Sequence, residues 1–282
     1  MEIAGKVAVI TGGASGIGRG IGRALAKRGA DVVVADVDAA RAAEVAAELQ
    51  EAGVRSIGVA CDVTERASVD ALAERAWAAL GRVDLLCNNA GVGTLGAVAD
   101  TALRDAEWLF AVNVWGVIHG CQVFVPRFLA AGRPAHVLNT GSEHSIGIPF
   151  PGMGMYTATK HAVLGLSDVL RRELEPHGVG VSILCPGVVR TEIWNAGRSR
   201  PDRFGGRQES PAEFAAFLES GMDPDEVGRI AVTGIEAGDF FIMSHPEVRA
   251  VAEARCQELL AAFDVAERRA GTNRPRLGPA TR

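Results

Sequence analysis

The chain has 282 residues, of which 48% are hydrophobic and 22% charged, a composition typical of a globular protein with one large domain or two small ones. Its net charge is −5 and its pI about 5.7, which argues against nucleic acid or an anionic membrane as a partner. The five cysteines are scattered and form no C-x-x-C pair, which argues against a zinc or disulfide framework and favours a reducing compartment. They are Cys61, Cys87, Cys121, Cys185 and Cys256.

The N-terminal stretch MEIAGKVAVITGG has no basic start and only a short apolar run, so it does not have the pattern of a signal peptide. No uninterrupted apolar run is long enough to span a bilayer. We therefore expect a cytoplasmic protein without a membrane partner. No group of residues has metal-ligand spacing, and we expect no metal site.

Short apolar runs alternate with segments of helical spacing along most of the chain. The predicted strands are 6–11, 31–36, 55–63, 83–91, 135–142, 179–187 and 239–244. The predicted helices are 16–29, 38–53, 64–81, 105–131, 156–178, 223–238 and 246–263. Continuously apolar strands between helices indicate a parallel sheet covered on both faces. The predicted fold is α/β: a doubly wound, mostly parallel sheet of about seven strands with helices on both faces, Rossmann-like.

The pattern weakens over residues 188–222, which mix Gly, Arg, Pro and Ser with short helical pieces. We interpret this segment as a substrate loop or lid. No repeat or linker divides the chain, so we expect a single domain over residues 1–268. Residues 269–282 are polar and rich in Pro and Gly, and we expect them to be disordered.

A glycine-rich turn, TGGASGIG at 11–18, follows the first predicted strand and opens the first predicted helix. Gly12, Gly16 and Gly18 allow a tight turn and the close approach of a ligand. The unpaired N–H groups at a helix start favour an anion, and a pyrophosphate suits that place. The spacing is G-x-x-x-G-x-G instead of the usual G-x-G-x-x-G, but strand, turn and helix follow in the order that a dinucleotide site requires.

Asp36 ends the second predicted strand, 18 residues after Gly18. An acid at about this distance accepts hydrogen bonds from the ribose 2′-hydroxyl, and its charge repels a 2′-phosphate. Asp36 therefore favours NAD over NADP, although a plain strand-end cap is the alternative. Asp62, after the third predicted strand, is a second candidate that would lie at the adenine.

Several motifs together resemble the short-chain dehydrogenase/reductase family, in its shorter, single-domain branch. They are TGGASGIG, NNAG at 88–91, Asn113, Ser142, YTATK at 156–160 and PG at 186–187. The similarity runs from about Lys6 to Thr191, with the motifs in the family's order. The resemblance implies an NAD(P)-dependent oxidoreductase that interconverts a secondary alcohol and a ketone.

The resemblance implies that Tyr156, the only tyrosine, is the general acid/base. Lys160 is one helical turn away, and its ammonium together with a positive nicotinamide ring would lower the pKa of Tyr156 by about three units, or roughly 4 kcal/mol. Ser142 would hold the substrate oxygen, with Ser145 as runner-up. Asn113 would anchor a water chain to Lys160. A tyrosine and a lysine one helical turn apart are more often a packed ring and a solvated amine. Here the complete set of motifs favours a catalytic role for Tyr156 and Lys160.

The predicted cofactor contacts are the residues that follow the strand ends, together with the catalytic pair. They are Gly12, Ser15, Gly16, Ile17, Gly18, Asp36, Asp62, Val63, Asn89, Ala90, Gly91, Tyr156, Lys160, Pro186, Gly187, Val189 and Thr191. Asn88 is expected to be buried scaffold.

Substrate specificity is expected in the segments 91–100, 143–155 and 188–222. The second is largely apolar, which suggests a hydrophobic alcohol or ketone, alicyclic or aromatic; the alternative is that its side chains only pack under the lid. The predicted substrate contacts are Ser142, His144, Phe150, Met153 and Trp194.

Three other functions remain open. An NADPH-dependent carbonyl reductase would use the same chemistry, but Asp36 and the non-basic Ser15 argue against it. A non-catalytic nucleotide-binding sensor would have no need of Tyr156. A sugar-nucleotide epimerase shares the Tyr and Lys pair but carries a larger substrate region than this chain has after its sixth strand.

The C-terminal part departs from the family pattern. GDFFIMSHPEVRA, at 238–250, stands where the branch usually has G-Q…D-G-G. The segments 105–131 and 156–176 resemble the helices that pair in the family's dimer. A homodimer is therefore the minimum expected assembly, and a homotetramer stays open.

Overall fold

The computed structural model describes residues 1–147, 150–209 and 212–270. Contacts within the chain divide it into two compact units, residues 1–245 and residues 246–282. The first unit contains the strands and the predicted site residues, the second contains one long helix, and each is described by itself. The single domain over residues 1–268 stays a prediction.

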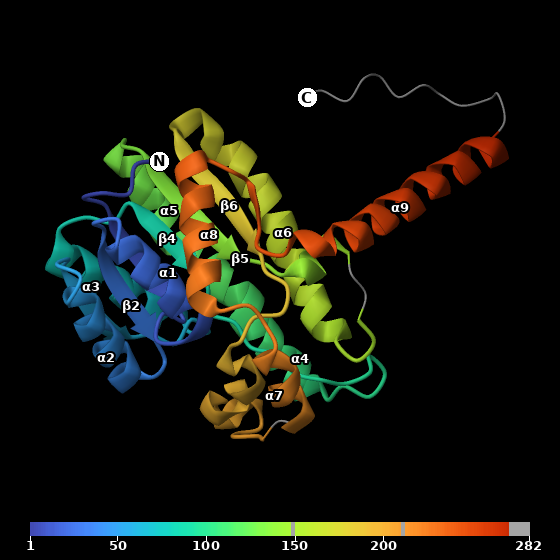
Figure 1. Cartoon of the computed structure of the whole chain (residues 1–282), viewed down its shortest axis with the longest axis horizontal. Helices are drawn as coiled ribbons and strands as arrows, with labels where there is room; N and C mark the ends of the chain where they lie inside the picture. Colours follow the sequence, from blue (N-terminus) through green and yellow to red (C-terminus); the bar gives the residue numbers. More distant parts are fainter. Residues whose placement is uncertain (148–149, 210–211, 271–282) are drawn as a thin grey trace. The chain divides into compact units, whose positions relative to one another are not determined.

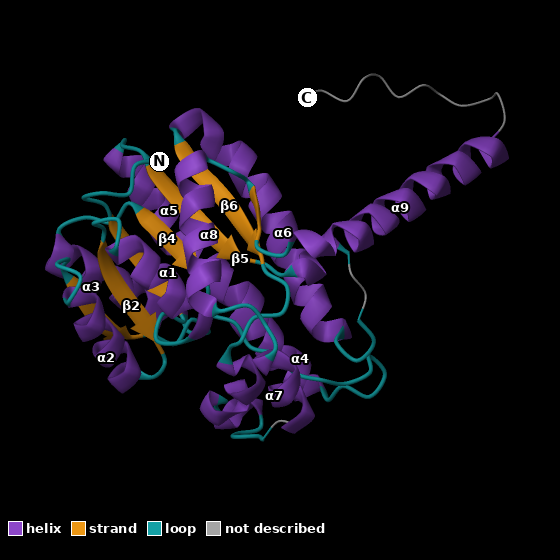
Figure 2. Cartoon of the chain, viewed as in Figure 1, coloured by secondary structure: helices purple, strands orange, loops and turns teal. Residues whose placement is uncertain are grey.

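Seven strands form one sheet within the first unit (Figures 1 and 2). They are β1 (Val7–Thr11), β2 (Asp31–Asp36), β3 (Ser56–Ala60), β4 (Leu85–Asn88), β5 (Ala135–Thr140), β6 (Val179–Cys185) and β7 (Phe241–Met243). Every neighbouring pair is parallel, in the order β3-β2-β1-β4-β5-β6-β7, which confirms the predicted fold class. On β1, Ala8 and Ile10 belong to one apolar layer and Val7 and Val9 to the other, so the strand is buried on both faces.

Helices cover both faces of this sheet. They are α1 (Gly16–Ala26), α2 (Ala39–Gln50), α3 (Arg66–Leu80), α4 (Leu103–Phe110), α5 (Gly116–Ala131), α6 (Gly154–Leu174), α7 (Ala212–Glu219) and α8 (Pro224–Ala237). Shorter turns of helix are η1 (Ala111–Trp115), η2 (Glu143–Ile146), η3 (Glu175–His177), η4 (Glu192–Ser199) and η5 (Asp202–Phe204). Apolar side chains of α1, α2 and α8 fill one layer, and those of α3, α4, α5 and α6 fill the other.

One helical stretch, Leu103–Ala131, has the length and composition of a membrane span, and 61% of its most apolar window is buried within the fold. It runs through α4, the π-helical η1 and α5. Trp108, Phe124 and Phe128 on this stretch belong to the apolar layer beneath the sheet. The stretch is therefore a core helix of the unit, which explains its apolar composition.

The strand order reverses between β1 and β4, and this reversal positions the candidate site. Loops at the carboxyl ends of these two neighbours lead to opposite sides, so a crevice opens between them. The side-chain amide of Asn89, after β4, donates to the carbonyl oxygens of Thr11 and Gly12, both at 3.1 Å. The backbone N–H of Asn89 also donates to the hydroxyl of Thr11, at 3.0 Å. The glycine turn and the end of β4 are thereby fixed to one another.

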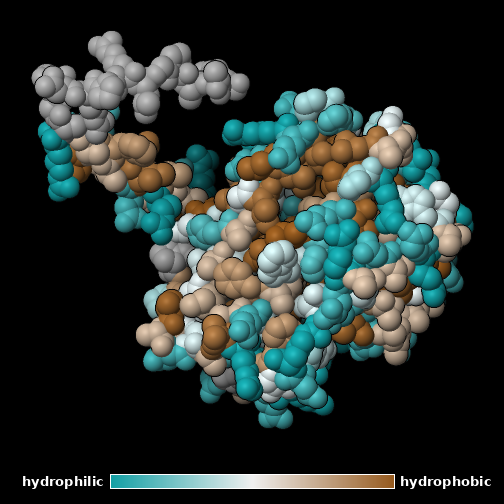
Figure 3. Space-filling model, turned by 180° about the vertical axis from the view of Figure 1, so that it is seen from behind, coloured by the Kyte–Doolittle hydropathy of each residue, from teal (hydrophilic) through white to brown (hydrophobic). Residues whose placement is uncertain are grey.

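Large apolar side chains are exposed on η1, α5 and α6. They are Trp115, Leu129, Leu166 and Val169. Figure 3 views the molecule from behind and shows that apolar surface gathers over part of that face. The helices that carry these side chains are the ones expected to pair in a dimer.

The second unit contains η6 (Pro246–Val248) and α9 (Arg249–Ala270). The predicted helix ended at residue 263, but α9 continues for seven residues more because DVAERRA contains no glycine or proline. The helix thus includes the first two residues of the predicted disordered tail. The rest of that tail, 271–282, lies outside the described residues.

Two helix-interior glycines have opposite packing. A Cβ added to Gly228 in α8 would lie 2.2 Å from the backbone of Gly20 in α1, so these helices touch backbone to backbone. A Cβ added to Gly165 in α6 would meet nothing within 4 Å.

We therefore expect Gly228→Ala to lower the free energy of unfolding by about 1–3 kcal/mol, because the added methyl overpacks the α1–α8 contact. Gly165→Ala is the matched control and should raise it by about 0.5–1 kcal/mol, because alanine loses less backbone entropy in a helix. Urea denaturation measures both. Equal effects of the two substitutions would contradict the close contact.

Candidate active site

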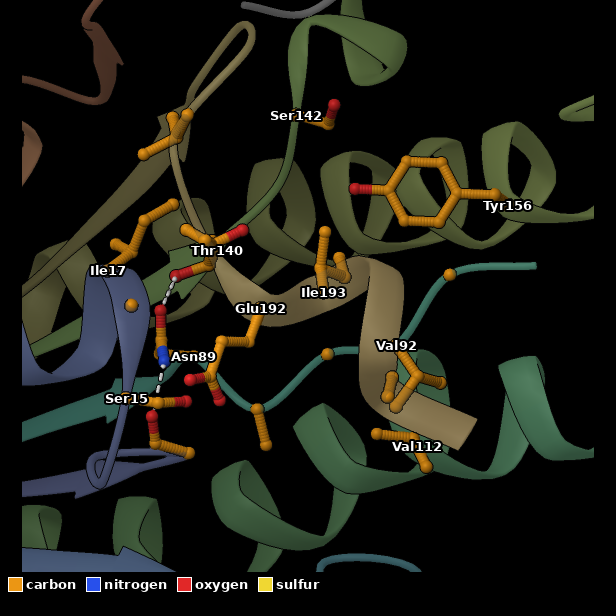
Figure 4. Close-up of a pocket in the computed structure, with 18 of the residues that line it drawn as sticks. Ser15, Ile17, Asn89, Val92, Val112, Thr140, Ser142, Tyr156, Glu192 and Ile193 are labelled. Atoms are coloured by element: carbon orange, nitrogen blue, oxygen red, sulfur yellow. Dashed lines mark hydrogen bonds between the residues drawn. The ribbon is translucent and has the colours of Figure 1, made fainter. Parts of the chain in front are cut away.

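A pocket opens at the carboxyl ends of the strands, beside the crevice between β1 and β4 (Figure 4). Loops after six strands contribute to its lining, and η4 and α7 close it from the other side. The sequence-predicted residues line it with four exceptions, which are Gly18, Asn113, Phe150 and Trp194. The roles of the lining residues remain predictions.

The glycine turn fits a bound phosphate group. Gly12 and Gly16 have φ angles of 63° and 49°, which L side chains rarely adopt. A Cβ on Gly12 would lie 2.8 Å from the Cα of Ala90 and would narrow the crevice. Ser15 and Ile17 line the pocket where α1 begins, so the helix N-terminus faces the site. A dinucleotide pyrophosphate matches this arrangement.

Gly18 lies behind the turn, away from the pocket lining. An added Cβ would be 2.2 Å from the carbonyl oxygen of Gly12 and 2.5 Å from Nδ2 of Asn89. Glycine at this position therefore lets α1 pack directly beneath the turn. Its predicted contact with a cofactor stays a prediction.

Asp36, at the end of β2, is held in place by two backbone donors. Its Oδ2 accepts from the N–H of Ala14 and its Oδ1 from the N–H of Asp38, both at 3.1 Å. The carboxylate lines the pocket. Nearby on α2, the guanidinium of Arg41 pairs with Glu192 of η4 at 2.7 Å. Arg41, the arginine of α2, is therefore already paired with an acid.

Ser142 and Tyr156 bring two hydroxyl groups to the pocket. Ser142 follows β5, and its hydroxyl accepts from the backbone N–H of His144 at 3.2 Å. Tyr156 lies in the first turn of α6, and Figure 4 shows its phenol oxygen directed into the pocket. Burial raises the pKa of Tyr156 to about 12, while a hydrogen bond with Ser142 acts in the opposite direction. Ser145 is instead committed to the scaffold, since its hydroxyl donates to the carbonyl oxygen of Lys160.

Lys160 is buried beneath Tyr156. Its Nζ donates to the carbonyl oxygen of Thr140 at 2.9 Å and lies 5.5 Å from the centre of the Tyr156 ring. Burial lowers the pKa of Lys160 to about 8, so a large fraction of the amine is neutral at mildly basic pH. In the chain alone the pKa of Tyr156 is raised, because desolvation of the phenol outweighs its hydrogen bond with Ser142. The lowering by Lys160 together with an oxidised nicotinamide stays a prediction.

Asn113 lies in η1 and is buried outside the pocket lining. Its amide bonds both backbone groups of Val92 at 2.9 and 3.0 Å and donates to the hydroxyl of Thr159. A Cβ on Gly91 would lie 3.6 Å from Oδ1 of Asn113 and 3.7 Å from Nζ of Lys160. Asn113 and Lys160 therefore flank the same short backbone segment.

The predicted substrate residues divide into two groups. His144 and Met153 line the pocket. His144 is neutral, because burial lowers its pKa to about 4, and its ring stands edge-on to that of Tyr156 at 5.3 Å. Phe150 is 44% exposed and packs on the His144 ring from outside, and Trp194 is absent from the lining.

None of the individual residues of the apolar wall was predicted from the sequence, although most of them lie in the segments 91–100 and 188–222, where substrate specificity was expected. This wall comes from the start of the 91–100 segment, from the core helix and from the 188–222 segment; the residues are Val92, Trp108, Val112, Ile193, Ala196, Pro201, Phe214, Phe217 and Leu218. Trp108 and Val112 are four residues apart on one helix, and EFAAFL at 213–218 has an apolar face. Both patterns are visible in the sequence, but neither indicates which surface these apolar side chains cover.

Ion pairs hold the described residues of the 188–222 segment over the pocket, and the role of this segment as a lid stays a prediction. The guanidinium of Arg200 is buried, pairs with Asp105 of α4 at 2.6 Å and lies over the Trp108 ring. Arg203 reaches Asp62 at 3.4 Å, and Glu192 reaches Arg41. The segment is thus tied to both sides of the pocket.

A family model described as short chain dehydrogenase matches residues 6–202. The chain belongs to the short-chain dehydrogenase family. It is therefore an oxidoreductase that acts on CH–OH groups with a nicotinamide cofactor. The resemblance inferred from the motifs is confirmed.

Two relatives illustrate the range within the family. The chain is 34% identical over 264 residues to a "C alpha-dehydrogenase" of Sphingobium sp., covering 90% of this chain and 85% of that protein. It is 40% identical over 222 residues to a "1-deoxy-11-beta-hydroxypentalenate dehydrogenase" of Streptomyces exfoliatus, covering 77% and 79%.

Solved structures of similar chains contain either cofactor. A short-chain dehydrogenase/reductase from Burkholderia phymatum in complex with NAD is 38% identical, with a TM-score of 0.87 over 98% of this chain and 100% of that one. A short-chain dehydrogenase from Sphingobium yanoikuyae in complex with NADPH is 28% identical, with a TM-score of 0.75 over 96% and 100%. The comparisons leave the choice of cofactor open.

Because the pKa of Lys160 in the folded chain lies below its ordinary value of 10.5, the unfolded chain holds this proton more tightly. Burial of the ammonium therefore costs stability below about pH 8, and the cost disappears as the pH rises from 8 to 10.5. Lys160→Met should be more stable than the wild type at pH 7 by about 1–3 kcal/mol, after loss of the Thr140 hydrogen bond. The excess should shrink across that pH range.

Denaturation at several pH values measures this difference. Lys27→Met, which removes an exposed lysine at the end of α1, is the control for losing one positive charge. An excess stability that stayed constant from pH 7 to 10.5 would contradict the buried ammonium as its cause.

Proposed function

We propose that this chain is an NAD-dependent dehydrogenase that interconverts an apolar secondary alcohol and its ketone, with Tyr156 as general acid/base. The observation that carries the proposal is that Ser142, Tyr156 and Lys160 line the same pocket as Asp36 and the apolar residues of the lid. One pocket therefore contains Tyr156, which would move a proton, Asp36, which would select the cofactor, and an apolar wall, which would hold the substrate.

Each side chain has a defined task in the proposed reaction. When bound, the nicotinamide cofactor accepts the hydride in oxidation and donates it in reduction. The phenolate of Tyr156 takes the hydroxyl proton of the alcohol during oxidation, and the phenol returns it to the carbonyl oxygen during reduction. Ser142 hydrogen-bonds the same substrate oxygen, which holds it beside the phenol.

Lys160 adjusts the acidity of Tyr156. A phenol whose pKa is about 12 is a poor base at neutral pH, so positive charge close to it must favour the phenolate. The Lys160 amine and the oxidised nicotinamide are the two sources of that charge. Thr140 fixes the amine through its carbonyl oxygen, so the amine stays in place under the ring.

Asp36 supports NAD as the cofactor. Its carboxylate is oriented by two backbone N–H groups and lines the pocket, where it can accept hydrogen bonds from a ribose diol and would repel a 2′-phosphate. Arg41, the neighbouring base that could attract such a phosphate, pairs with Glu192.

Titration with NADH and NADPH, followed by energy transfer from tryptophan to the reduced nicotinamide, tests this choice. We expect NADH to bind at least tenfold more tightly, which is about 1.4 kcal/mol. Asp36→Asn should reduce the preference about tenfold, because the negative charge is lost while the size is kept. Asp38→Asn is the control, since asparagine caps α2 equally well. Tighter NADPH binding by the wild type would reject NAD.

The pocket wall supports an apolar substrate. The core helix and the 188–222 segment line the pocket with aliphatic and aromatic side chains, and His144 is neutral. The names of the two relatives describe dehydrogenases, and a hydroxypentalenate is a hydroxylated substrate. We propose a bulky secondary alcohol, alicyclic or aromatic.

Oxidation of a panel of such alcohols, followed as NADH absorbance, tests the reaction. Tyr156→Phe should lower kcat by about 10²–10⁴-fold, because the proton acceptor is lost while the ring remains. Its NADH affinity should stay within about twofold of the wild type. Retained turnover in Tyr156→Phe would reject the acid/base role. Tight NADH binding without turnover of any alcohol or ketone would favour a non-catalytic nucleotide-binding protein.

We also propose that the chain forms at least a homodimer, through the exposed apolar surface on η1, α5 and α6. Trp115 and Val169 are 53% and 57% exposed, which is unusual for large apolar side chains unless another surface covers them. Cytoplasmic residence stays a prediction.

A further inference from the structure

The departure from the family pattern after β7 brings a histidine to the pocket loop. His245 directly follows Ser244 at the end of β7, and both side chains are buried. The Nδ1 atom of His245 is 3.0 Å from the backbone nitrogen of Gly187, and its Nε2 atom is 2.9 Å from the carbonyl oxygen of Val188. One imidazole ring thus bonds two consecutive residues of a loop 58 and 57 positions earlier in the chain.

Backbone chemistry fixes the tautomer of this ring. The N–H of Gly187 can only donate, so Nδ1 must be an unprotonated acceptor. The carbonyl of Val188 can only accept, so Nε2 must carry the proton. A single neutral form of His245 satisfies both bonds. Ser244, whose hydroxyl is 2.8 Å from Nδ1, donates or turns away without changing this assignment.

The loop held by His245 forms one wall of the pocket. Pro186, Gly187, Val188 and Val189 all belong to the lining. Two backbone contacts also restrain this loop: the N–H of Glu143 donates to the carbonyl oxygen of Pro186, and that of Met222 donates to Val188. The first contact places the loop next to Ser142, at the reacting end of the pocket. His245 supplies the side-chain restraint.

The ring of His245 fills the space beside Gly187. A Cβ on Gly187 would lie 2.8 Å from Cγ of His245, so the ring occupies the space that any other residue would fill. The Val188 carbonyl oxygen keeps the Met222 donor if the ring is removed, whereas Gly187 would lose the only acceptor that the described residues offer it. Loss of the ring therefore acts mainly at Gly187.

We propose that His245 is a positioning residue that holds the 186–189 loop against the nicotinamide half of the cofactor. This inference rests on the proposed dehydrogenase function. The ring does not touch the reacting atoms; it sets where the Gly187 and Val188 backbone stands.

Binding of two ligands by the full-length chain tests the proposal. NADH carries the nicotinamide, and ADP-ribose lacks it. His245→Leu removes both hydrogen bonds and should weaken NADH binding about tenfold, while ADP-ribose affinity stays within about twofold. His245→Asn places Oδ1 two bonds from Cβ, as Nδ1 is, and should restore NADH affinity to within about threefold of the wild type. Ser244→Ala is the matched control and should leave both affinities unchanged.

Equal weakening of both ligands in His245→Leu would overturn the proposal, because it would indicate a general loss of structure. Unchanged NADH binding in that variant would also overturn it. Thermal melting shows whether His245→Leu folds. If it does not, His245→Asn decides by itself. A loss of up to about threefold in NADH affinity alone supports the proposal, whereas an equal loss in ADP-ribose affinity contradicts it. Failure of the proposed function is distinct, since it would show in the wild type itself, as tighter binding of NADPH than of NADH or as the absence of turnover.

Discussion

The pocket depends on one constraint: the neighbouring strands β1 and β4 end side by side, and the loops that follow them lead to opposite sides of the sheet. The side-chain amide of Asn89 bridges the gap by donating to Thr11 and Gly12, so the glycine turn and the end of β4 form one body. Lys160 joins the same frame from α6 through the carbonyl oxygen of Thr140. Because the three elements are fixed to the sheet, the side chains between them have little freedom to shift relative to one another.

Local sequence predicts those parts of the structure whose cause is itself local. Strands such as β2 and β6 lie between two helical layers, so their apolar runs can be recognised without knowing their partners. The glycine turn predicts a tight bend, because residues other than glycine rarely adopt the φ angles of Gly12 and Gly16. The spacing of Tyr156 and Lys160 places both on one helix face. Strand ends then bring most of the predicted site residues to one edge of the sheet.

The remaining features depend on contacts between distant segments. The position of the 188–222 segment depends on the buried side chain of Arg200, whose partner Asp105 lies on another helix, so nothing near residue 200 indicates that Phe214 and Phe217 line the pocket. The role of His245 is likewise visible only when β7 is seen beside the Gly187 loop. The raised pKa of Tyr156 reflects desolvation, which depends on the whole enclosure rather than on the neighbouring lysine.

The 188–222 segment is anchored unequally at its two borders. The Arg200 side chain is 1% exposed and that of its partner Asp105 is 23% exposed, while the side chains of the Glu192–Arg41 and Arg203–Asp62 pairs are 30–47% exposed. Salt screens exposed charges over about 8 Å at physiological ionic strength and buried pairs much less. Ionic strength therefore loosens the border nearest α2 and leaves the border at α4 in place. The attachment of residues 188–222 to the rest of the fold should therefore depend on salt concentration on one side of the pocket and much less on the other.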